Sequence, residues 1–217
     1  DGKNWYPPII GLPLRIYGQD SYLMNIDQID IKRIIEIAQQ AGTAILKVYD
    51  TDFSVYEKSD QSPLTEADLA AHRVIANSLL ELTPEIPILS EESATIPYSL
   101  RSTWSRYWLI DPLDGTKEFV KRNGEFTVNI ALIDNMRPVI GVIYVPVSKV
   151  SYYSSTDGGA YKQMPGKEPE PIKASARHTS PVRVAGSRSH AGESLKRFLE
   201  NLGEHHIISM GSSLKSC

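Results

Sequence analysis

The sequence predicts an α+β protein whose C-terminal portion is α/β. Apolar residues recur at helical spacing over residues 31–48 and again over 65–80. From residue 126 to 153, short apolar runs alternate with turns, as in an antiparallel meander. After Pro181 a strand, a helix and a second strand follow one another, which is typical of a βαβ unit. Helices packed on an antiparallel sheet, followed by an α/β portion, are therefore expected.

Composition limits the class of protein and of partner. A chain of 217 residues with 41% hydrophobic residues can bury one substantial core or two small ones. The net charge of −3 and the pI near 6.0 give no broad positive field, so no nucleic acid polymer is expected as a partner. Any phosphate-bearing ligand must then be held by local groups or by a metal.

Cysteine content and apolar run lengths indicate the compartment. The one cysteine, Cys217, rules out an internal disulfide and a cysteine zinc site, which fits a reducing environment. The longest apolar runs, such as 139–145, are too short to span a bilayer, so no transmembrane helix is expected. A cytoplasmic protein is predicted. Peripheral association with the cytoplasmic face of the inner membrane is left open, as is the oligomeric state.

The N-terminal part predicts a leader followed by two helices. Residues 1–24 carry several prolines and glycines and are expected to be a leader that does not pack, with Met24 as a candidate natural start. The first helix is predicted from its periodic apolar residues, with Asp27 or Asp30 as its cap. The second helix should begin at the motif Thr65-Glu66-Ala67-Asp68, which resembles a capping box and places Asp68 in the first turn.

Strands are predicted from short apolar runs that end abruptly. The runs 86–89 and 107–110 are each followed by acids, which are Glu91 and Glu92 after the first and Asp111 and Asp114 after the second. A proline-rich loop is expected at 164–171. The other predicted elements are strands at 128–133, 139–145, 150–153, 182–185 and 206–209, and a helix at 193–202.

The segment Asp111-Pro112-Leu113-Asp114-Gly115 is the main candidate for chemistry. Pro112 and Gly115 favour a tight turn in which both carboxylates and the Leu113 carbonyl converge on one point. Mg²⁺ prefers carboxylate, carbonyl and water oxygens, and Glu91 at a neighbouring strand end is the natural fourth donor. The alternative is an acidic surface turn, which is common for so short a motif.

Longer motifs carry a resemblance to a known family. They are SPLTEAD, ILSEES, RYWLIDPLDGTKEFVKRNGEFTVNIALID, SRSH and GSSLK, spread between about residues 26 and 215. With them the chain resembles the magnesium-dependent, lithium-sensitive inositol monophosphatase superfamily. DPLDGTKEF looks specifically like its bacterial 3′(2′),5′-bisphosphate nucleotidases. The resemblance implies an αβαβα sandwich, with a metal-binding domain at 25–180 and a C-terminal α/β domain at 181–217.

The resemblance also implies roles for particular residues. Asp68, Glu91 and Thr116 would be catalytic, with Asp68 supporting the metal cluster and Thr116 hydrogen-bonding the attacking water. The implied metal ligands are Glu91, Asp111, the Leu113 carbonyl and Asp114. The implied substrate-binding residues are Glu91, Leu113, Asp114, Gly115, Thr116, His190, Ser212 and Lys215. For Ser212 and the following serine, capping of a helix is an equally good explanation.

The implied reaction is Mg²⁺-dependent hydrolysis of adenosine 3′,5′-bisphosphate to AMP and phosphate, and the sulfated nucleotide is a further candidate substrate. In the family this reaction clears a by-product of sulfate assimilation. The family also carries a Trp-Asp-Thr-Ala-Ala-Gly motif beyond GSSLK, which this sequence lacks, so a truncated C-terminal domain is expected. The alternatives left open are an inositol or sugar monophosphatase and an inactive fragment of the nucleotidase.

Overall fold

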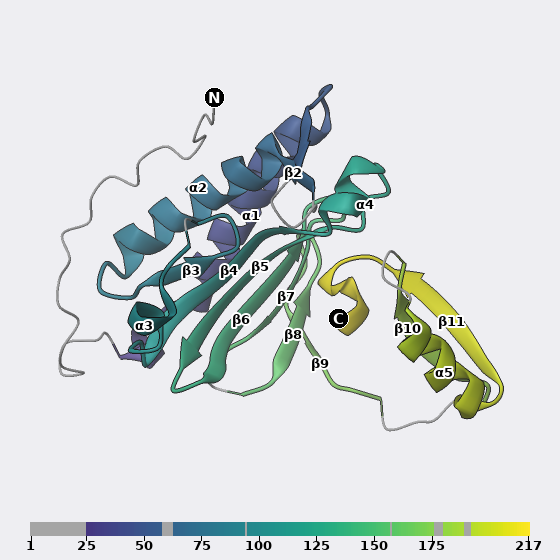
Figure 1. Cartoon of the computed structure of the whole chain (residues 1–217). Helices are drawn as coiled ribbons and strands as arrows, with labels where there is room; N and C mark the ends of the chain where they lie inside the picture. Colours follow the sequence, from purple (N-terminus) through teal and green to yellow (C-terminus); the bar gives the residue numbers. More distant parts are fainter. Residues whose placement is uncertain (1–24, 58–62, 94, 157, 176–179, 189–191) are drawn as a thin grey trace.

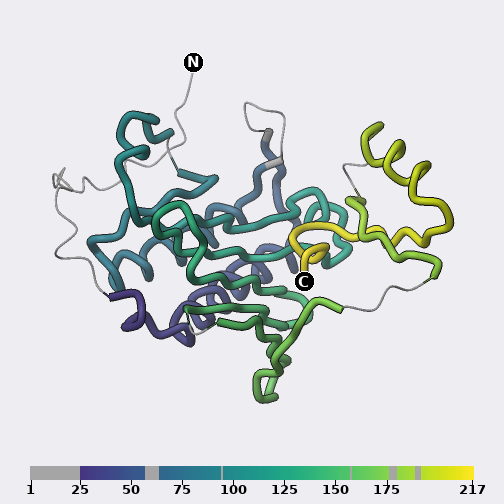
Figure 2. The backbone as a smooth tube through the Cα atoms, turned by 90° about the horizontal axis from the view of Figure 1, so that it is seen from below, coloured from purple at the N-terminus to yellow at the C-terminus, as the bar shows by residue number. Residues whose placement is uncertain are grey.

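The computed structural model describes residues 25–57, 63–93, 95–156, 158–175, 180–188 and 192–217. The expected leader at 1–24 and the candidate substrate residue His190 lie outside these ranges. Within them, two long helices cover one face of a seven-stranded sheet, and a small βαβ unit lies beside that sheet (Figures 1 and 2). Among the described residues, no helix is both long and apolar enough to cross a membrane.

Helix α1, Ile31–Tyr49, confirms the first predicted helix. The Asp30 side chain accepts the Lys32 backbone N–H at 2.9 Å and so caps the helix start. One face of α1 is buried against the sheet and α2, through Ile34, Ile35, Ile37, Ala38, Ala41, Gly42 and Ile45. A short 3₁₀ helix, η2 at Ile26–Gln28, precedes it.

Helix α2, Glu66–Leu82, begins with the predicted capping box. The Thr65 backbone N–H and hydroxyl both donate to Asp68 Oδ2, at 2.8 and 2.6 Å. The Thr65 hydroxyl oxygen in turn accepts the Ala67 N–H at 3.2 Å. This reciprocal bonding satisfies donors that a helix start otherwise leaves unpaired. A two-stranded hairpin, β1 at Val55–Glu57 and β2 at Pro63–Thr65, leads into α2.

The main sheet has the strand order β3-β4-β5-β6-β7-β8-β9, in which β3 and β4 are parallel and all other neighbours are antiparallel. Its strands are β3 Ile88–Ser90, β4 Arg106–Asp114, β5 Thr127–Asp134, β6 Arg137–Val145, β7 Val150–Ser154, β8 Ala160–Gln163 and β9 Glu170–Ile172. The antiparallel meander predicted from residue 126 onward is confirmed. Two short helices lie in the connections, α3 at Tyr98–Arg101 and α4 at Thr116–Val120.

The proline-rich loop predicted at 164–171 was wrong at its end, because residues 170–172 form strand β9. Pro171 pairs with Tyr161 of β8, and β9 is the last strand of the sheet. Proline has no N–H to donate, and in a central strand every N–H faces a neighbouring strand. In an edge strand, a proline can direct its nitrogen to the side that has no neighbour. The edge location therefore explains why a proline-rich segment joins the sheet.

The core lies between the helices and the facing side of the sheet. Trp108 of β4 is fully buried there, and its indole N–H donates to the Thr83 hydroxyl at the end of α2, at 2.9 Å. Aromatic residues close the end of the core near α4, where the Phe119 ring lies 5.3 Å from that of Phe126 and 5.1 Å from that of Tyr49. The core thus anchors β4 from one side and leaves the end of that strand to the site described below.

The C-terminal portion contains β10 Val182–Ser187, α5 Glu193–Leu202 and β11 His205–Met210, with the two strands parallel. This confirms the predicted βαβ unit. None of the described residues of α5 is buried, and Phe198 is 56% exposed, so the unit has little core of its own. The 3₁₀ helix η3, Ser213–Ser216, follows β11 and lies between the unit and the main sheet (Figure 1).

Candidate active site

The acids predicted at two strand ends are brought to one edge of the sheet. Strands β3 and β4 are parallel and in register, with Ser90 beside Ile110. The Glu91 backbone N–H donates to the Ile110 carbonyl at 3.4 Å. Since the two strands run in the same direction, Glu91 follows the end of β3 next to the point where β4 passes from Ile110 to Asp111. The two predicted strands are neighbours, as expected, although β3 begins at Ile88 rather than at residue 86 and β4 runs on to Asp114 rather than ending at residue 110.

The tight turn predicted over residues 111–115 was wrong. Strand β4 continues to Asp114, and the chain turns only at Gly115, whose φ is 94°. Asp111 pairs with Asn129 of β5, but Asp114 pairs with Thr127, so one residue of β4 is extra. Such a bulge disrupts the ladder locally and tolerates the missing N–H of a proline. Pro112 lies within it.

The bulge brings the two aspartates together by a different route from the expected turn. In a regular strand, residues three positions apart point to opposite faces. Asn129 and Thr127 lie two positions apart on β5 and share a face, and cross-strand partners share their face as well. Asp111 and Asp114 therefore lie on the same side of the sheet. Helices α1 and α2 cover the opposite side, where Ile110 is buried.

Asp68 connects helix α2 to the turn after β4. Its side chain is 1% exposed, and its Oδ1 accepts the Thr116 hydroxyl at 3.2 Å. The same hydroxyl lies 3.3 Å from the Leu113 carbonyl oxygen. A hydroxyl has one proton to donate and two lone pairs to accept with. Because the Thr116 proton is directed to one of these two oxygens, its lone pairs remain for a further donor such as water.

Asp114 is held by two residues that the sequence analysis did not place in the site. Its Oδ2 accepts a short hydrogen bond from the Ser213 hydroxyl and a weaker one from Asn129 Nδ2 at 3.3 Å. Asn129 Nδ2 also donates to Ser213 Oγ at 2.9 Å. An amide within the otherwise apolar strand 128–133 was the available signal for Asn129. Ser213 depends on a contact between segments 99 positions apart.

The predicted substrate residues at the C-terminus lie against this cluster. Ser212 is 7% exposed, and its hydroxyl oxygen accepts the Leu214 N–H at 3.3 Å, so it caps η3 as the alternative interpretation expected. The Lys215 ammonium donates to the Ser212 carbonyl. A Cβ atom on Gly115 would lie 3.1 Å from the Ser212 Cβ. The structure thus brings Ser212 to the turn after β4, while its contact with substrate stays a prediction.

A histidine of helix α2 contacts the end of β3. His72 of α2 places Nδ1 2.9 Å from the Ser90 hydroxyl, and that hydroxyl oxygen accepts the Glu92 N–H at 3.2 Å. Burial, and then the charge of Arg73, lower the pKa of His72 below its usual 6.5. A neutral ring can accept a hydrogen bond from the Ser90 hydroxyl on Nδ1, which holds the end of β3 next to Glu91.

The donor set fits a hard divalent cation in its chemistry. Glu91, Asp111 and Asp114 offer carboxylates and Leu113 offers a carbonyl, which are the oxygen ligands that Mg²⁺ and Ca²⁺ take. Within the described part of the chain, however, no three acidic or histidine side chains already form a group that could hold a metal ion. The carboxylates of Asp68 and Asp114 are engaged with protein hydroxyls instead. Metal binding would require some of these hydrogen bonds to be exchanged.

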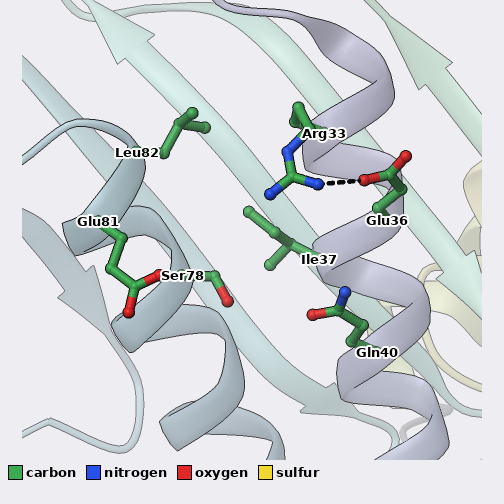
Figure 3. A pocket seen from close by; sticks show the side chains of 7 residues that line it. All are labelled: Arg33, Glu36, Ile37, Gln40, Ser78, Glu81 and Leu82. Carbon is green, nitrogen blue, oxygen red and sulfur yellow. Dashed lines mark hydrogen bonds and ion pairs between the residues drawn. The ribbon is translucent and has the colours of Figure 1, made fainter.

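A cavity of about 270 Å³ lies elsewhere, in the groove between α1 and α2 (Figure 3). Its lining is Arg33, Glu36, Ile37, Gln40, Ser78, Glu81 and Leu82. Arg33 Nη1 and Glu36 Oε2 form an ion pair at 2.6 Å across one wall. Of the predicted site residues that the structure describes, none lines this cavity, so it is separate from the acidic cluster at the end of β4.

Comparison with known proteins identifies the group to which this arrangement belongs. The profile of the inositol monophosphatase family matches residues 27–217. The chain belongs to the inositol monophosphatase family. Enzymes of this family are metal-dependent, in agreement with the oxygen donors at the end of β4.

Several relatives within the family are similar to this chain in sequence as well as in fold. The 3′(2′),5′-bisphosphate nucleotidase CysQ of Escherichia coli K12 is 50% identical over 189 residues, which cover 86% of this chain and 75% of that protein. Its counterpart in Salmonella typhimurium LT2 is 49% identical over the same shares. The crystal structure of CysQ from Bacteroides thetaiotaomicron matches with a TM-score of 0.73 at 42% identity, over 86% of this chain and 74% of that one. The inositol monophosphatase-like fold expected from the sequence is confirmed.

Proposed function

We infer that this chain is a 3′(2′),5′-bisphosphate nucleotidase of the CysQ type, which hydrolyses adenosine 3′,5′-bisphosphate to AMP and phosphate. The observation that carries this inference is the 50% identity over 189 residues to the E. coli nucleotidase. The strand-end acids of β3 and β4 lie within the matched region and supply the donors that a metal-dependent phosphatase needs.

The cation of this site is proposed to be Mg²⁺, held by Glu91, Asp111, the Leu113 carbonyl and Asp114. All four donors are oxygens, which favours a hard cation over zinc. When bound, such a cation lowers the pKa of a coordinated water and neutralises charge on the phosphoryl oxygens. The bulge in β4 supports this assignment because it directs Asp111 and Asp114 to one side of the sheet.

Thr116 and Asp68 are proposed to orient the attacking water. The Thr116 hydroxyl donates a hydrogen bond to Asp68 Oδ1 or to the Leu113 carbonyl oxygen. Its oxygen can then accept a hydrogen bond from a water molecule, which directs a lone pair of that water toward the phosphorus. Asp68 is well suited to hold the Thr116 hydroxyl in place, because the other oxygen of its carboxylate accepts hydrogen bonds from the Thr65 hydroxyl and backbone N–H.

The second, non-scissile phosphate is proposed to bind at the C-terminal segment. Lys215 offers a cation there, and Ser212 offers a hydroxyl close to Gly115. Gly115 has no side chain, which lets Ser212 lie against the turn after β4. His190 is assigned to the nucleotide on the family resemblance alone, because it lies outside the described residues.

Phosphate release tests this function directly. The chain is assayed on adenosine 3′,5′-bisphosphate and on inositol 1-phosphate, each with Mg²⁺, with EDTA and with added Li⁺. Release from the nucleotide that requires Mg²⁺ and is inhibited by Li⁺ is expected. A preference for inositol 1-phosphate would instead assign the chain to the monophosphatases, and release from neither would contradict an active nucleotidase.

A variant of the central acid separates chemistry from folding. Asp111→Asn keeps the side-chain size but removes the charge, so turnover should fall by at least about 100-fold if the carboxylate holds a catalytic cation. The circular dichroism spectrum and the unfolding midpoint should stay near wild type, because Asp111 is partly exposed. Mg²⁺-dependent turnover close to wild type in a folded variant would overturn the metal assignment.

A further inference from the structure

Glu125, just after α4, joins two parts of the chain that are far apart in sequence. Its Oε2 accepts Arg188 Nε at 2.9 Å and the Gly211 backbone N–H at 2.8 Å. Its Oε1 accepts Arg188 Nη2 at 2.8 Å, and that Nη2 also donates to the Ser209 carbonyl at 2.7 Å. One carboxylate therefore ties the segment before β5 to the ends of both β10 and β11.

The pairing has a geometry that fixes orientation as well as distance. Two parallel N–H···O bonds between a guanidinium and a carboxylate allow little rotation of either group. Hydrogen bonding from Arg188 is the main cause that lowers the pKa of Glu125, so the carboxylate is charged at neutral pH. The two side chains are 42% and 25% exposed, and exposed ion pairs typically add only about 0–1 kcal/mol to stability. A positional effect is therefore the larger consequence to expect.

The segments that this pair joins are in close contact. A Cβ atom on Gly211 would lie 2.4 Å from Glu118 Cγ and 2.9 Å from the Glu125 carbonyl oxygen. On the opposite side of the contact, a Cβ atom on Gly115 would lie 3.0 Å from that same carbonyl oxygen. Two glycines thus let the chain after β11 lie directly on the turn after β4, with no space for a side chain at either position.

The contact continues into the candidate site. Two residues beyond Gly211, the Ser213 hydroxyl donates to Asp114, and Asn129 bonds to both. Lys215 follows on the same 3₁₀ turn. Because the βαβ unit has no buried helix residue among those described, its placement relative to the sheet depends on few interactions. Glu125 contributes three hydrogen bonds to that placement, two from Arg188 and one from the Gly211 N–H.

We propose that Glu125 and Arg188 are a positioning pair that sets recognition of the bisphosphate. The pair holds residues 211–215 against the turn at Gly115, so that Ser212 and Lys215 reach the non-scissile phosphate of the substrate. This rests on the proposed nucleotidase function and adds to it the residues that govern selection of a bisphosphate over a monophosphate. Neither member of the pair contacts the reacting phosphate.

Steady-state kinetics with two substrates test the proposal. Arg188→Gln, Arg188→Lys and Glu125→Gln are compared on adenosine 3′,5′-bisphosphate and on adenosine 3′-monophosphate, which lacks the non-scissile phosphate. In Arg188→Gln and Glu125→Gln, KM for the bisphosphate should rise about tenfold, equivalent to about 1.4 kcal/mol of binding free energy. Their kcat, and both constants for the monophosphate, should change less than about twofold. For Arg188→Lys, KM for the bisphosphate should lie between wild type and Arg188→Gln, because lysine keeps the charge but cannot form the two parallel hydrogen bonds.

A second ion pair, which lies in the main sheet, provides a control. Arg106 Nε and Asp134 Oδ1 lie 2.8 Å apart at the opposite end of β4 from Asp114, with side chains 13% and 20% exposed. Asp134→Asn should leave the substrate preference unchanged. Amide hydrogen exchange gives a readout independent of activity, since Glu125→Gln weakens the bond of the Gly211 N–H and should speed exchange within residues 205–217. Asp134→Asn should not.

The outcomes separate this proposal from the proposed function. If wild type releases phosphate from neither nucleotide, the function fails, and faster exchange in Glu125→Gln alone still supports the contact. If wild type prefers the bisphosphate and Arg188→Gln keeps that preference, the proposal is overturned. It is also overturned if kcat on the monophosphate falls equally, which indicates general disruption. A loss of preference in Arg188→Gln but not in Glu125→Gln would mean that Arg188 binds the phosphate itself.

Discussion

Gly115 is the position where a single methyl group should disturb both the fold and the site. Its backbone has φ 94° and ψ 39°, in the left-handed region that side chains disfavour. It lies between Asp114, a proposed metal ligand, and Thr116, the proposed water-orienting residue. A change of backbone at Gly115 therefore moves both neighbours, and Gly115→Ala is the smallest such change.

The expected loss of stability in Gly115→Ala has two separate causes, backbone strain and steric overlap. An alanine in the left-handed region costs about 1–2 kcal/mol relative to glycine. The new Cβ would also lie 3.0 Å from the Glu125 carbonyl oxygen and 3.1 Å from Ser212 Cβ, and overpacking of this kind costs about 1–3 kcal/mol. Together these predict a loss of about 2–5 kcal/mol in the free energy of unfolding. A displacement of about 1 Å at the site is expected to lower kcat/KM by about 100-fold.

Two further glycine variants separate the two costs. Gly141→Ala adds a methyl group with no atom within 4 Å and without a positive φ, so its unfolding free energy should lie within about 0.5 kcal/mol of wild type. Gly211→Ala has no positive φ but brings its Cβ 2.4 Å from Glu118 Cγ, so it should show the steric cost alone. Urea unfolding at pH 7 measures all three variants, and phosphate release measures their activity.

A Gly115→Ala protein as stable as the Gly141→Ala control would contradict the expected loss of stability. A Gly115→Ala protein that is destabilised by several kcal/mol but keeps wild-type kcat/KM in the folded fraction would contradict the expected effect on the site. The second result would mean that Asp114 and Thr116 do not depend on the backbone between them.

Three other expectations concern the supports of the site. Trp108→Phe should lower the unfolding free energy by about 2–4 kcal/mol in urea titrations, because it loses the bond to Thr83 and leaves a cavity in the core. Burial lowers the pKa of His72, so the folded state favours the neutral ring. The contribution of His72 to the free energy of unfolding should therefore be full above pH 6.5 and decrease as the pH falls below that value. His72→Gln should remove this part of the pH dependence of stability. Hydrogen bonding from Arg188 is the main cause that lowers the pKa of Glu125. The contribution of Glu125 to the free energy of unfolding should be present above its ordinary pKa of 4.5 and be lost as the pH falls through its lower pKa in the folded protein. Arg188→Gln should flatten the plot of stability against pH in that range.

Features that depend on neighbouring residues could be predicted from the sequence. The cap at Asp30, the capping box at Thr65 and the apolar periodicity of α1 all involve residues within one or two turns of each other. The acids at the ends of β3 and β4 were predicted because strand ends leave a local signal. Strand β9 was missed because Pro171 is compatible with a strand only at the edge of a sheet, and a sheet edge is a property of the whole topology.

The bulge in β4 shows where local reasoning gave a correct grouping for an incorrect reason. Pro112 and Gly115 were interpreted as turn residues, and a turn would also bring Asp111 near Asp114. The structure groups the two acids by pairing Asp111 with Asn129 and Asp114 with Thr127, which depends on the register of β5. Register is set by the hydrophobic face of the partner strand, and the segment 111–115 by itself does not contain that information.

The contacts of the site that were missed share a physical cause. Ser213 meets Asp114, and Arg188 meets Glu125, across separations of 99 and 63 positions, and the distance along the chain gives no indication of either. Each involves a residue type that is common at surfaces. Only Asn129 had a sequence signal, because a polar amide in an apolar strand needs partners. Its partners could not be named without the structure.

Asp68 shows why helix-start motifs and catalytic motifs are difficult to separate by sequence. Its Oδ2 completes the capping box with Thr65, while its Oδ1 receives the Thr116 hydroxyl, so the two oxygens of one carboxylate serve different structures. The capping bonds restrict rotation of the carboxylate, and that restriction is what keeps Oδ1 directed at Thr116. Replacing Asp68 would therefore change stability and catalysis together. At this position the capping interpretation and the proposed functional interpretation use different oxygens of one carboxylate, and the rigidity of the helix start is what would direct Oδ1 to the proposed site.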